Sequence, residues 1–169
     1  FGIGDVQIFG FVFRNQLRKL VGSLLEGFKL YQQSEDYKPS KLLLHTNWLE
    51  GWDIPRFIKE FDLKNEDVLT TFVCGHCKHF HISEFTGPQR DCPNCGSQKG
   101  CRTPGVDFGL TEEQLNLVYN LMDFYIHPIT SGGLEMPLVE AMMSGLPVAT
   151  VDYSCGSEFT DSGLVEKID

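Results

Sequence analysis

Short apolar runs alternate along this chain with longer segments in which apolar residues recur every three or four positions. The first pattern is typical of buried β-strands, and the second is typical of one face of an α-helix. Because helical crossovers join parallel strands, the alternation predicts an α/β fold, a Rossmann-like parallel sheet with flanking helices. The predicted strands are residues 7–13, 41–46, 68–73, 124–129 and 146–151.

Helix signals separate these strands. Between the first two strands, apolar side chains from Leu17 to Tyr31 fall on one helical face, and Asn15 is the candidate N-cap. Three kinds of signal mark the other helices: a proline in the first turn, a capping box, and a glycine just after the last turn. These helices are predicted after Asp53, after Thr111 and at Pro137, the last one ending at Gly145.

Two CxxC pairs, separated by 14 residues, interrupt the alternation; they are Cys74, Cys77, Cys92 and Cys95. Zinc prefers four tetrahedral thiolate or imidazole ligands, so this spacing predicts a zinc ribbon over residues 74–105. The ribbon is then an insertion into a Rossmann-like domain formed by residues 1–73 and 106–169. Four protein ligands leave no open position for water, so we expect a structural zinc. The alternative ligands nearby are His76, His79, His81 and Cys101.

Composition disfavours several classes of protein. The net charge of −9 repels phosphate backbones, so no nucleic-acid partner is expected. No apolar run approaches the roughly 20 residues that span a bilayer, so no transmembrane segment is expected. The strand-like start, Phe1 to Phe13, lacks the features of a signal peptide, and a cytoplasmic location is expected. Both ends of the sequence indicate a piece of a longer polypeptide.

A glycine-containing loop is the strongest candidate for a ligand site. The strand ending at His127 is followed by Ser131, Gly132 and Gly133, and a helix starts at Pro137. Free backbone amides at a helix N-terminus favour an anion such as a diphosphate. Open parallel sheets bind ligands at the carboxyl ends of their strands, where this loop should lie.

The segment from Pro128 to Ala149 resembles a known motif. Its pattern, P-x-x-x-x-G-x-x-x-P-L-V-E-A-M-x-S-G-L-P-V-A, is similar to the donor-binding motif of retaining GT-B glycosyltransferases of group 1, or family 4-like. Arg14 and Lys19, in FRNQLRK, stand where that family has an Arg and a Lys after the first strand of its C-terminal domain. TEEQLNLVYNLMDFYIHP and VDYSCGSEF resemble the segments on either side of the motif.

The resemblance implies that the chain is the donor domain of a hexosyltransferase-like enzyme that binds a UDP- or GDP-linked sugar. Arg14 and Lys19 would neutralise the diphosphate leaving group, and Glu140 would accept hydrogen bonds from the ribose hydroxyls. The donor loop would be Ser131, Gly132, Gly133 and Leu134, the last two offering backbone amides. The family usually needs no catalytic metal. An N-terminal acceptor domain would be missing, so this fragment alone should transfer little or no sugar.

One position departs from the family pattern. The family has paired glutamates eight residues apart, and the first falls on Gly132 here; Glu135 stands where the family usually has glycine. Either Glu135 takes over the sugar contact and joins the catalytic groups, or the sugar is held differently, or activity is reduced. The plainer interpretation is that Arg14 and Lys19 are solvated cations.

Two rival functions remain at this stage. The first alternative is a non-catalytic binding module with a degenerate glycosyltransferase fold, whose zinc ribbon docks a partner protein. The second is another Rossmann-type enzyme, but no GxGxxG follows the first strand, which disfavours a dinucleotide redox enzyme.

Overall fold

The structure is a computed structural model that describes residues 6–168, so the first five residues of the strand-like start, Phe1 to Phe13, lie outside it. Within the described residues, nine strands form one sheet, in the order β5-β6-β3-β2-β1-β7-β8-β9, with β4 paired to β3. The pairs among the parallel strands confirm the predicted architecture. These strands are β1 (Gln7–Val12), β2 (Ser40–His45), β3 (Val68–Cys74), β7 (Phe124–His127), β8 (Val148–Val151) and β9 (Glu166–Ile168).

The continuous apolar runs form the centre of the sheet. Phe11 of β1 is in register with Leu44 of β2, and both are fully buried. Leu42 and Leu43 are buried too, although consecutive residues of a strand point to opposite faces. The sheet is therefore covered on both faces at its centre. Burying each such side chain stabilises the fold by roughly 1.5–3 kcal/mol.

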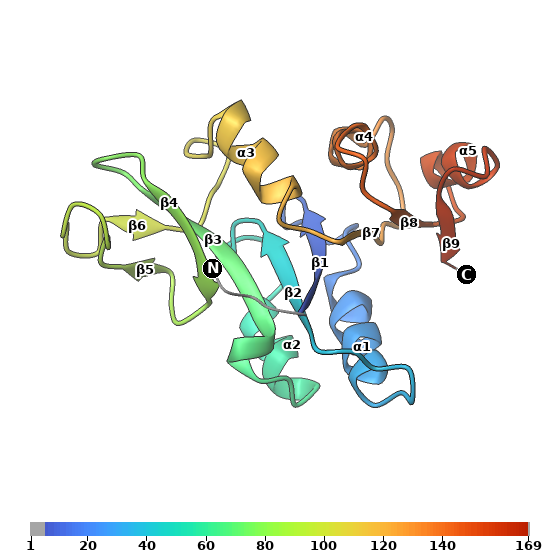
Figure 1. Cartoon of the computed structure of the whole chain (residues 1–169), viewed down its shortest axis with the longest axis horizontal. Helices are drawn as coiled ribbons and strands as arrows, with labels where there is room; N and C mark the ends of the chain where they lie inside the picture. Colours follow the sequence, from blue (N-terminus) through green and yellow to red (C-terminus); the bar gives the residue numbers. More distant parts are fainter. Residues whose placement is uncertain (1–5, 169) are drawn as a thin grey trace.

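The helices lie on two sides of this sheet (Figure 1). In that view α1 (Val21–Gln32) and α2 (Ile54–Glu60) lie below the strands, and a short 3₁₀ helix, η1 (Asn65–Asp67), precedes β3. On the other side lie α3 (Glu112–Tyr119), α4 (Met136–Met143) and α5 (Cys155–Thr160). None of the helices within residues 6–168 is long and apolar enough to cross a membrane.

The segment with the CxxC pairs extends the same sheet. Its strands, β4 (Phe80–Glu84) and β6 (Cys101–Arg102), both pair antiparallel with β3, and β5 (Gln89–Arg90) pairs with β6. A small second core forms there around Phe72, Cys74, Cys92 and Cys101. The insert is thus continuous with the main sheet through β3, whose last residue is the first cysteine of the first pair. The domain boundaries predicted from the sequence stay a prediction.

The first helix differs from its predicted start. It begins at Val21 with no side-chain cap, and Leu17 is largely exposed ahead of it. Asn15, the predicted cap, instead donates hydrogen bonds to the carbonyls of Glu50 and Trp52. A Cβ on Gly51, where φ is +58°, would lie 2.2 Å from the Asn15 carbonyl oxygen. The tight packing of these two loops therefore holds the chain out of the helix.

Candidate functional site

The basic loop, residues 14–20 after β1, lies against the glycine loop, residues 128–135 after β7. β1 and β7 are parallel neighbours, so their carboxyl ends meet at one edge of the sheet. Two backbone hydrogen bonds of 3.0 Å join the loops, from Leu20 to the Pro128 carbonyl and from Thr130 to the Arg18 carbonyl. The fold thus brings Lys19, one of the two predicted cations, beside the predicted anion-binding loop.

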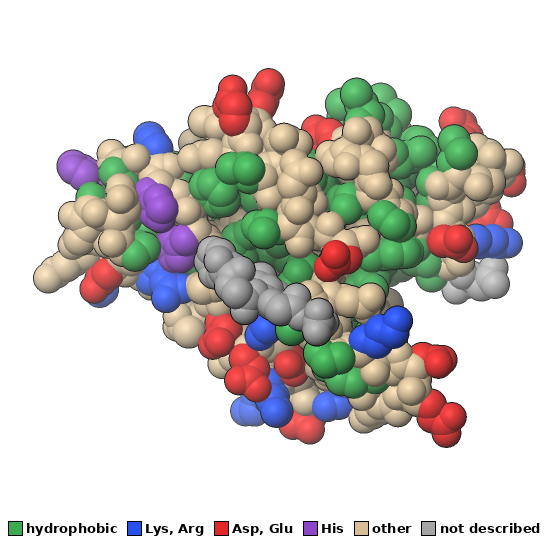
Figure 2. All heavy atoms as spheres, viewed as in Figure 1, with side chains coloured by type: hydrophobic (Ala, Val, Ile, Leu, Met, Phe, Trp, Pro, Cys, Tyr) green, Lys and Arg blue, Asp and Glu red, His purple; other side chains and the backbone are tan. Residues whose placement is uncertain are grey.

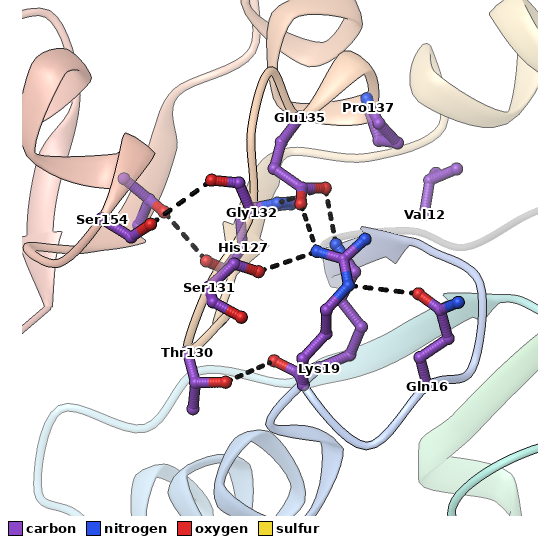
Figure 3. Close-up of polar contacts among 12 residues, drawn as sticks. Val12, Gln16, Lys19, His127, Thr130, Ser131, Gly132, Glu135, Pro137 and Ser154 are labelled. Carbon is purple, nitrogen blue, oxygen red and sulfur yellow. Dashed lines mark hydrogen bonds and ion pairs between the residues drawn. The ribbon is translucent and has the colours of Figure 1, made fainter.

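Glu135 in the glycine loop pairs with two cations of the basic loop (Figure 3). Lys19 Nζ lies 2.6 Å from Oε2, and Arg18 Nη1 lies 2.6 Å from Oε1. The side chains of Lys19 and Glu135 are buried, whereas that of Arg18 is 39% exposed and also donates to the Ser131 carbonyl at 2.8 Å. Two cations around one carboxylate leave positive charge at this junction.

Burial and the neighbouring charges act in opposite directions on the pKa values of Lys19 and Glu135. Burial lowers the pKa of Lys19 below its usual 10.5, against the raising effect of the hydrogen bond to Glu135. Burial would raise the pKa of Glu135, but the hydrogen bonds from Lys19 and Arg18 outweigh it and lower that pKa below 4.5. Glu135 is therefore an ionised carboxylate at neutral pH, and it ties the two loops together.

The glycine at position 132 makes room for that carboxylate. A Cβ built on Gly132 would lie 2.2 Å from Glu135 Oε1 and 3.1 Å from Arg18 Nη1, whereas a Cβ on Gly133 would meet nothing within 4 Å. The carboxylate of Glu135 thus lies where a side chain at position 132 would begin (Figure 3). The two departures from the family pattern, Gly132 and Glu135, meet at one point in space.

His127 lies beneath this junction and is fully buried. Its Nδ1 is 3.2 Å from the Tyr125 hydroxyl, and its Nε2 is 3.5 Å from Glu135 Oε2. No hydrogen-bond partner reaches Nε2 among residues 6–168. Burial, helped by the charge of Lys19, lowers the pKa of His127 to about 4, so the ring is neutral at neutral pH.

Arg14 and Glu140 line one cavity of about 350 Å³ at the carboxyl ends of β1 and β2. Arg14 is mostly exposed there, and its Nε is 3.5 Å from Glu50 Oε2. Glu140 comes from α4, and its Oε2 accepts a hydrogen bond of 2.7 Å from the buried Tyr119 hydroxyl. Lys19 does not line this cavity, because it is buried under the glycine loop.

Two residues at the site were not found by sequence reasoning. Arg18 stands between the two predicted cations in FRNQLRK, and Tyr119 occupies the last turn of α3. Each acts through a partner more than 20 positions away along the chain, at Glu135 or Glu140. The basic composition of FRNQLRK was the one available signal for Arg18, and no sequence signal pointed to Tyr119.

The four cysteines of the CxxC pairs lie together in the insert. Their sulfur atoms are all within 4.8 Å of one another. The Cys77–Cys92 and Cys74–Cys95 sulfur pairs are 3.6 and 3.8 Å apart. Four sulfurs about 2.3 Å from one tetrahedral zinc ion would be separated by about 3.8 Å, so the donor set fits zinc. The backbone amide of His76 also donates to Cys74 Sγ at 3.4 Å.

Comparison with protein families gives one match: residues 85–167 match the family described as Glycosyl transferases group 1. No curated protein matches the chain at a significant level. Among solved structures, the N-terminal domain of Candida albicans trehalose-6-phosphate phosphatase is 9% identical, with a TM-score of 0.62. That match covers 97% of this chain and 31% of that one.

Two further structures are similar over almost the whole chain. TarM is 15% identical with a TM-score of 0.60, over 96% of this chain and 25% of that chain. The C-terminal domain of the group 1 glycosyl transferase LpcC from Francisella tularensis is 12% identical with a TM-score of 0.52. That match covers 94% of this chain and 77% of that one. At these identities the likeness shows the fold. The chain spans less than a third of the first two structures.

Proposed function

Because residues 85–167 belong to the group 1 glycosyltransferases and the chain folds like one half of a GT-B enzyme, we propose that it binds a nucleoside-diphosphate sugar as the donor for glycosyl transfer. The observation that carries the proposal is the cavity that Arg14 and Glu140 line, since these two residues are far apart along the chain and were predicted together. The UDP- and GDP-linked sugars are the candidate donors.

The diphosphate of the donor lies over the junction of the two loops. As the glycosidic bond breaks, negative charge grows on the leaving diphosphate, and cations already fixed in place stabilise it. Arg14 and Arg18 are both partly exposed and can reach such a group, while the buried Lys19 adds positive charge from beneath. The backbone amides of Gly133 and Leu134, in the loop just before α4, add donors for an oxygen anion.

Glu135 serves as the carboxylate that contacts the donor sugar. Its position beside Gly132 supports this role, because a glutamate at position 132 would have to place its side chain in the same space. Glu140 then accepts hydrogen bonds from the ribose hydroxyls, with Tyr119 fixing the orientation of its carboxylate. The donor sugar is thereby held between the junction and the cavity.

The four-cysteine site holds a structural zinc ion in this proposal. Cys74, Cys77, Cys92 and Cys95 complete a tetrahedral shell, which leaves no position for a reacting water. The ion would organise an insert whose own apolar core is small. Catalysis itself would need no metal at the donor diphosphate, since fixed cations are already present there.

Transfer to an acceptor requires a second domain, which we place against the glycine loop and α4. Figure 2 shows hydrophobic side chains gathered around α4, and Leu134, Met136 and Met143 there are 71%, 52% and 84% exposed. Exposed apolar side chains of this kind mark surfaces that contact another protein surface. A partner domain at this position would close over the donor and bring the acceptor to it.

Calorimetric titration of the chain with UDP and with GDP tests the proposal. We expect one of them to bind, and Arg14→Ala to weaken that binding about tenfold, the effect of a lost charge-assisted contact. Arg56→Ala is the matched control, because Arg56 on α2 is also exposed and also pairs with one glutamate, Glu60. A folded protein that binds neither nucleotide, or an Arg14→Ala variant that binds as well as Arg56→Ala, would contradict it.

A further inference from the structure

We propose that the cysteine cluster of the insert is a site of reversible oxidation, in which a peroxide oxidises Cys95 and the resulting disulfide comes to rest between Cys74 and Cys101. Cys101 is a fifth cysteine beside the four that the proposed zinc shell uses. The inference rests on the proposed zinc site only for the ionisation of the thiolates and for one of its readouts. The disulfide itself depends on where the sulfur atoms lie.

Cys101 lies against the cluster although it is not one of the four close-set sulfurs. Its side chain is fully buried in the small core that also contains Phe72, Cys74 and Cys92. Its thiol is within hydrogen-bonding reach of the sulfur atoms of Cys92 and Cys74. A buried thiol is protected from oxidants in solution, but it can attack a neighbouring sulfur that has already been oxidised. Cys101 therefore occupies the position of a resolving cysteine.

Cys74 and Cys101 face each other across two antiparallel strands, β3 and β6. The backbone amide of Cys74 donates to the His79 carbonyl at 2.8 Å, and its carbonyl accepts from the Lys78 amide at 3.1 Å. Both backbone groups of Cys74 thus point away from β6, so the two cysteines form a non-hydrogen-bonded pair. The Cα atoms of such a pair are about 4.5 Å apart, within the roughly 4.4–6.8 Å that a disulfide spans.

The cysteines differ in their access to an oxidant. Cys95 is exposed, Cys77 is half-buried, and Cys74, Cys92 and Cys101 are buried. A cysteine that ligates zinc is a thiolate, which is the form that peroxides oxidise. Cys95 is therefore the first sulfur that a peroxide reaches, and its sulfur lies 3.8 Å from that of Cys74.

The chemistry takes three steps. The Cys95 thiolate attacks an oxygen of the peroxide, which gives a sulfenic acid and hydroxide. The Cys74 thiolate then attacks the Cys95 sulfur and displaces a second hydroxide, which forms the Cys74–Cys95 disulfide. Finally Cys101 gives its proton to hydroxide and attacks the Cys74 sulfur, and Cys95 leaves as a thiolate. Two electrons from the cysteines have then reduced one hydrogen peroxide to water, with protons from solvent and from Cys101.

The last step moves the disulfide from the surface to the buried pair between β3 and β6. Cys95 returns to the thiolate form, and a disulfide, unlike a sulfinic acid, can be restored by a thiol reductant. Cys74 is no longer a thiolate, so three of the four proposed zinc ligands are left. Because metal binding and folding are coupled at such sites, oxidation should release zinc and loosen the insert.

Disulfide mapping tests the inference directly. The purified chain is treated with a stoichiometric amount of hydrogen peroxide, its free thiols are blocked, and the peptides are mapped by mass spectrometry without reduction. A chromogenic chelator measures zinc release in parallel. We expect Cys74–Cys101 to be the dominant link, the bound zinc to be lost as the link forms, and dithiothreitol to restore both the thiols and zinc binding.

Two variants with one thiol fewer identify the role of Cys101. Cys101→Ser keeps all four proposed zinc ligands, so it should bind zinc before oxidation. Its oxidation should stop at Cys74–Cys95 and continue to sulfinic acid at Cys95, which dithiothreitol does not reverse. Cys155→Ser is the matched control, because Cys155 lies in α5 outside the cluster, and this variant should behave like the unmodified chain.

The outcomes separate this inference from the proposed zinc site. A dominant link among the four ligands alone, such as Cys74–Cys95, in the unmodified chain would overturn it. The same holds if Cys101→Ser is oxidised and recovers just as Cys155→Ser does. Should Cys101→Ser fail to fold, the mapping of the unmodified chain still decides. If the chain carries no zinc, the proposed metal site fails, while the position of the disulfide still supports or overturns the role of Cys101.

Discussion

Glu135 Oε2 lies 2.6 Å from Lys19 Nζ, and the two side chains are only 7% and 3% exposed. The pair joins residues that are 116 positions apart along the chain. It connects the loop after β1 to the loop after β7, which are adjacent because β1 and β7 are parallel neighbours. This ion pair therefore contributes to the fold and also sets the charge of the proposed donor site.

Breaking this pair from one side should be costly. Lys19→Met leaves the Glu135 carboxylate buried with Arg18 as its remaining cation, and loss of one partner of a buried pair typically costs about 3–5 kcal/mol. We expect the free energy of unfolding, measured in urea, to fall by an amount in this range. In Lys19→Met/Glu135→Leu, which leaves no buried charge, much of the loss should be recovered.

The control for this prediction is Arg56→Ala, which removes an exposed pair with Glu60 and should change stability by at most about 1 kcal/mol. If Lys19→Met were no more destabilising than Arg56→Ala, the buried pair would not be holding the loops together. If the double variant were less stable than Lys19→Met, the carboxylate itself would be the important group.

The hydrogen bond from Tyr119 to Glu140 gives a prediction about the ribose. Tyr119→Phe removes the donor that fixes the carboxylate, and one such bond contributes about 1 kcal/mol, or several-fold in affinity. We expect Tyr119→Phe to reduce the preference for UDP over 2′-deoxy-UDP, and Glu140→Ala to abolish it. Calorimetric affinities for the two ligands measure this. An unchanged preference in Glu140→Ala would remove Glu140 from the ribose contact.

Much of the fold could be predicted from local sequence patterns. The apolar runs that form β1, β2 and β3 become buried whatever they pack against, so the sequence alone reveals them. The start of α1 did not follow, although Leu17 continues the helical period. There the side chain of Asn15 donates a hydrogen bond to the distant Trp52 carbonyl, and the backbone of Lys19 forms an isolated β-bridge with Ile129. These tertiary contacts outweigh the helical preference of the segment. The strand β9 was not predicted, because its three residues, Glu166 to Ile168, include only one apolar side chain.

Sequence reasoning named several residues that lie at the candidate site, but it did not show how they pair with one another. The family resemblance assigned Arg14 and Glu140 to one donor site, and the two residues line one cavity in the structure. It did not show that Lys19 is buried and already paired, because that depends on how the carboxylate of Glu135 is oriented. Arg18 and Tyr119 were missed for the same reason.

The four-cysteine cluster predicts one zinc ion per chain. Cys92→Ser removes one of four ligands, so we expect loss of most of the bound metal and a less stable insert, since metal binding is coupled to folding at such sites. Cys155→Ser is the control, because Cys155 lies in α5 outside the cluster. Elemental analysis of both purified variants measures the effect. A metal-free unmodified chain, or equal zinc in both variants, would contradict the prediction.

His127 predicts a loss of stability in mild acid. Its pKa is near 6.5 when the chain is unfolded and about 4 in the fold, where burial and then the charge of Lys19 lower it. The unfolded state therefore binds the extra proton first, and the free energy of unfolding should fall as the pH drops from 6.5 to 4, by roughly 3 kcal/mol.

His45 acts in the same direction, because burial lowers its pKa to about 4 as well. Replacing one histidine should therefore remove only part of the pH dependence. We expect His127→Gln to reduce the slope of stability against pH between 6.5 and 4 by about one proton. Urea unfolding at several pH values measures it. A slope identical to that of the unmodified chain would show that His127 is protonated equally in both states.

The contact between Gly132 and Glu135 gives a prediction that separates two neighbouring glycines. In Gly132→Ala the new methyl group would lie 2.2 Å from Glu135 Oε1, so the carboxylate must move away from Arg18. Because Lys19 holds the other oxygen, this shift strains a buried ion pair, and such overpacking typically costs about 1–3 kcal/mol. Gly133→Ala should be nearly neutral, since its methyl group meets nothing within 4 Å.

Urea unfolding of the two variants measures this difference, and a third variant identifies its cause. In Gly132→Ala/Glu135→Ala the obstructing carboxylate is absent, so adding the methyl group at position 132 should cost little relative to Glu135→Ala alone. If Gly132→Ala were as stable as Gly133→Ala, the carboxylate would have free space elsewhere and would not be confined beside position 132. If the methyl group cost as much without Glu135 as with it, the strain would lie in the backbone of the loop instead.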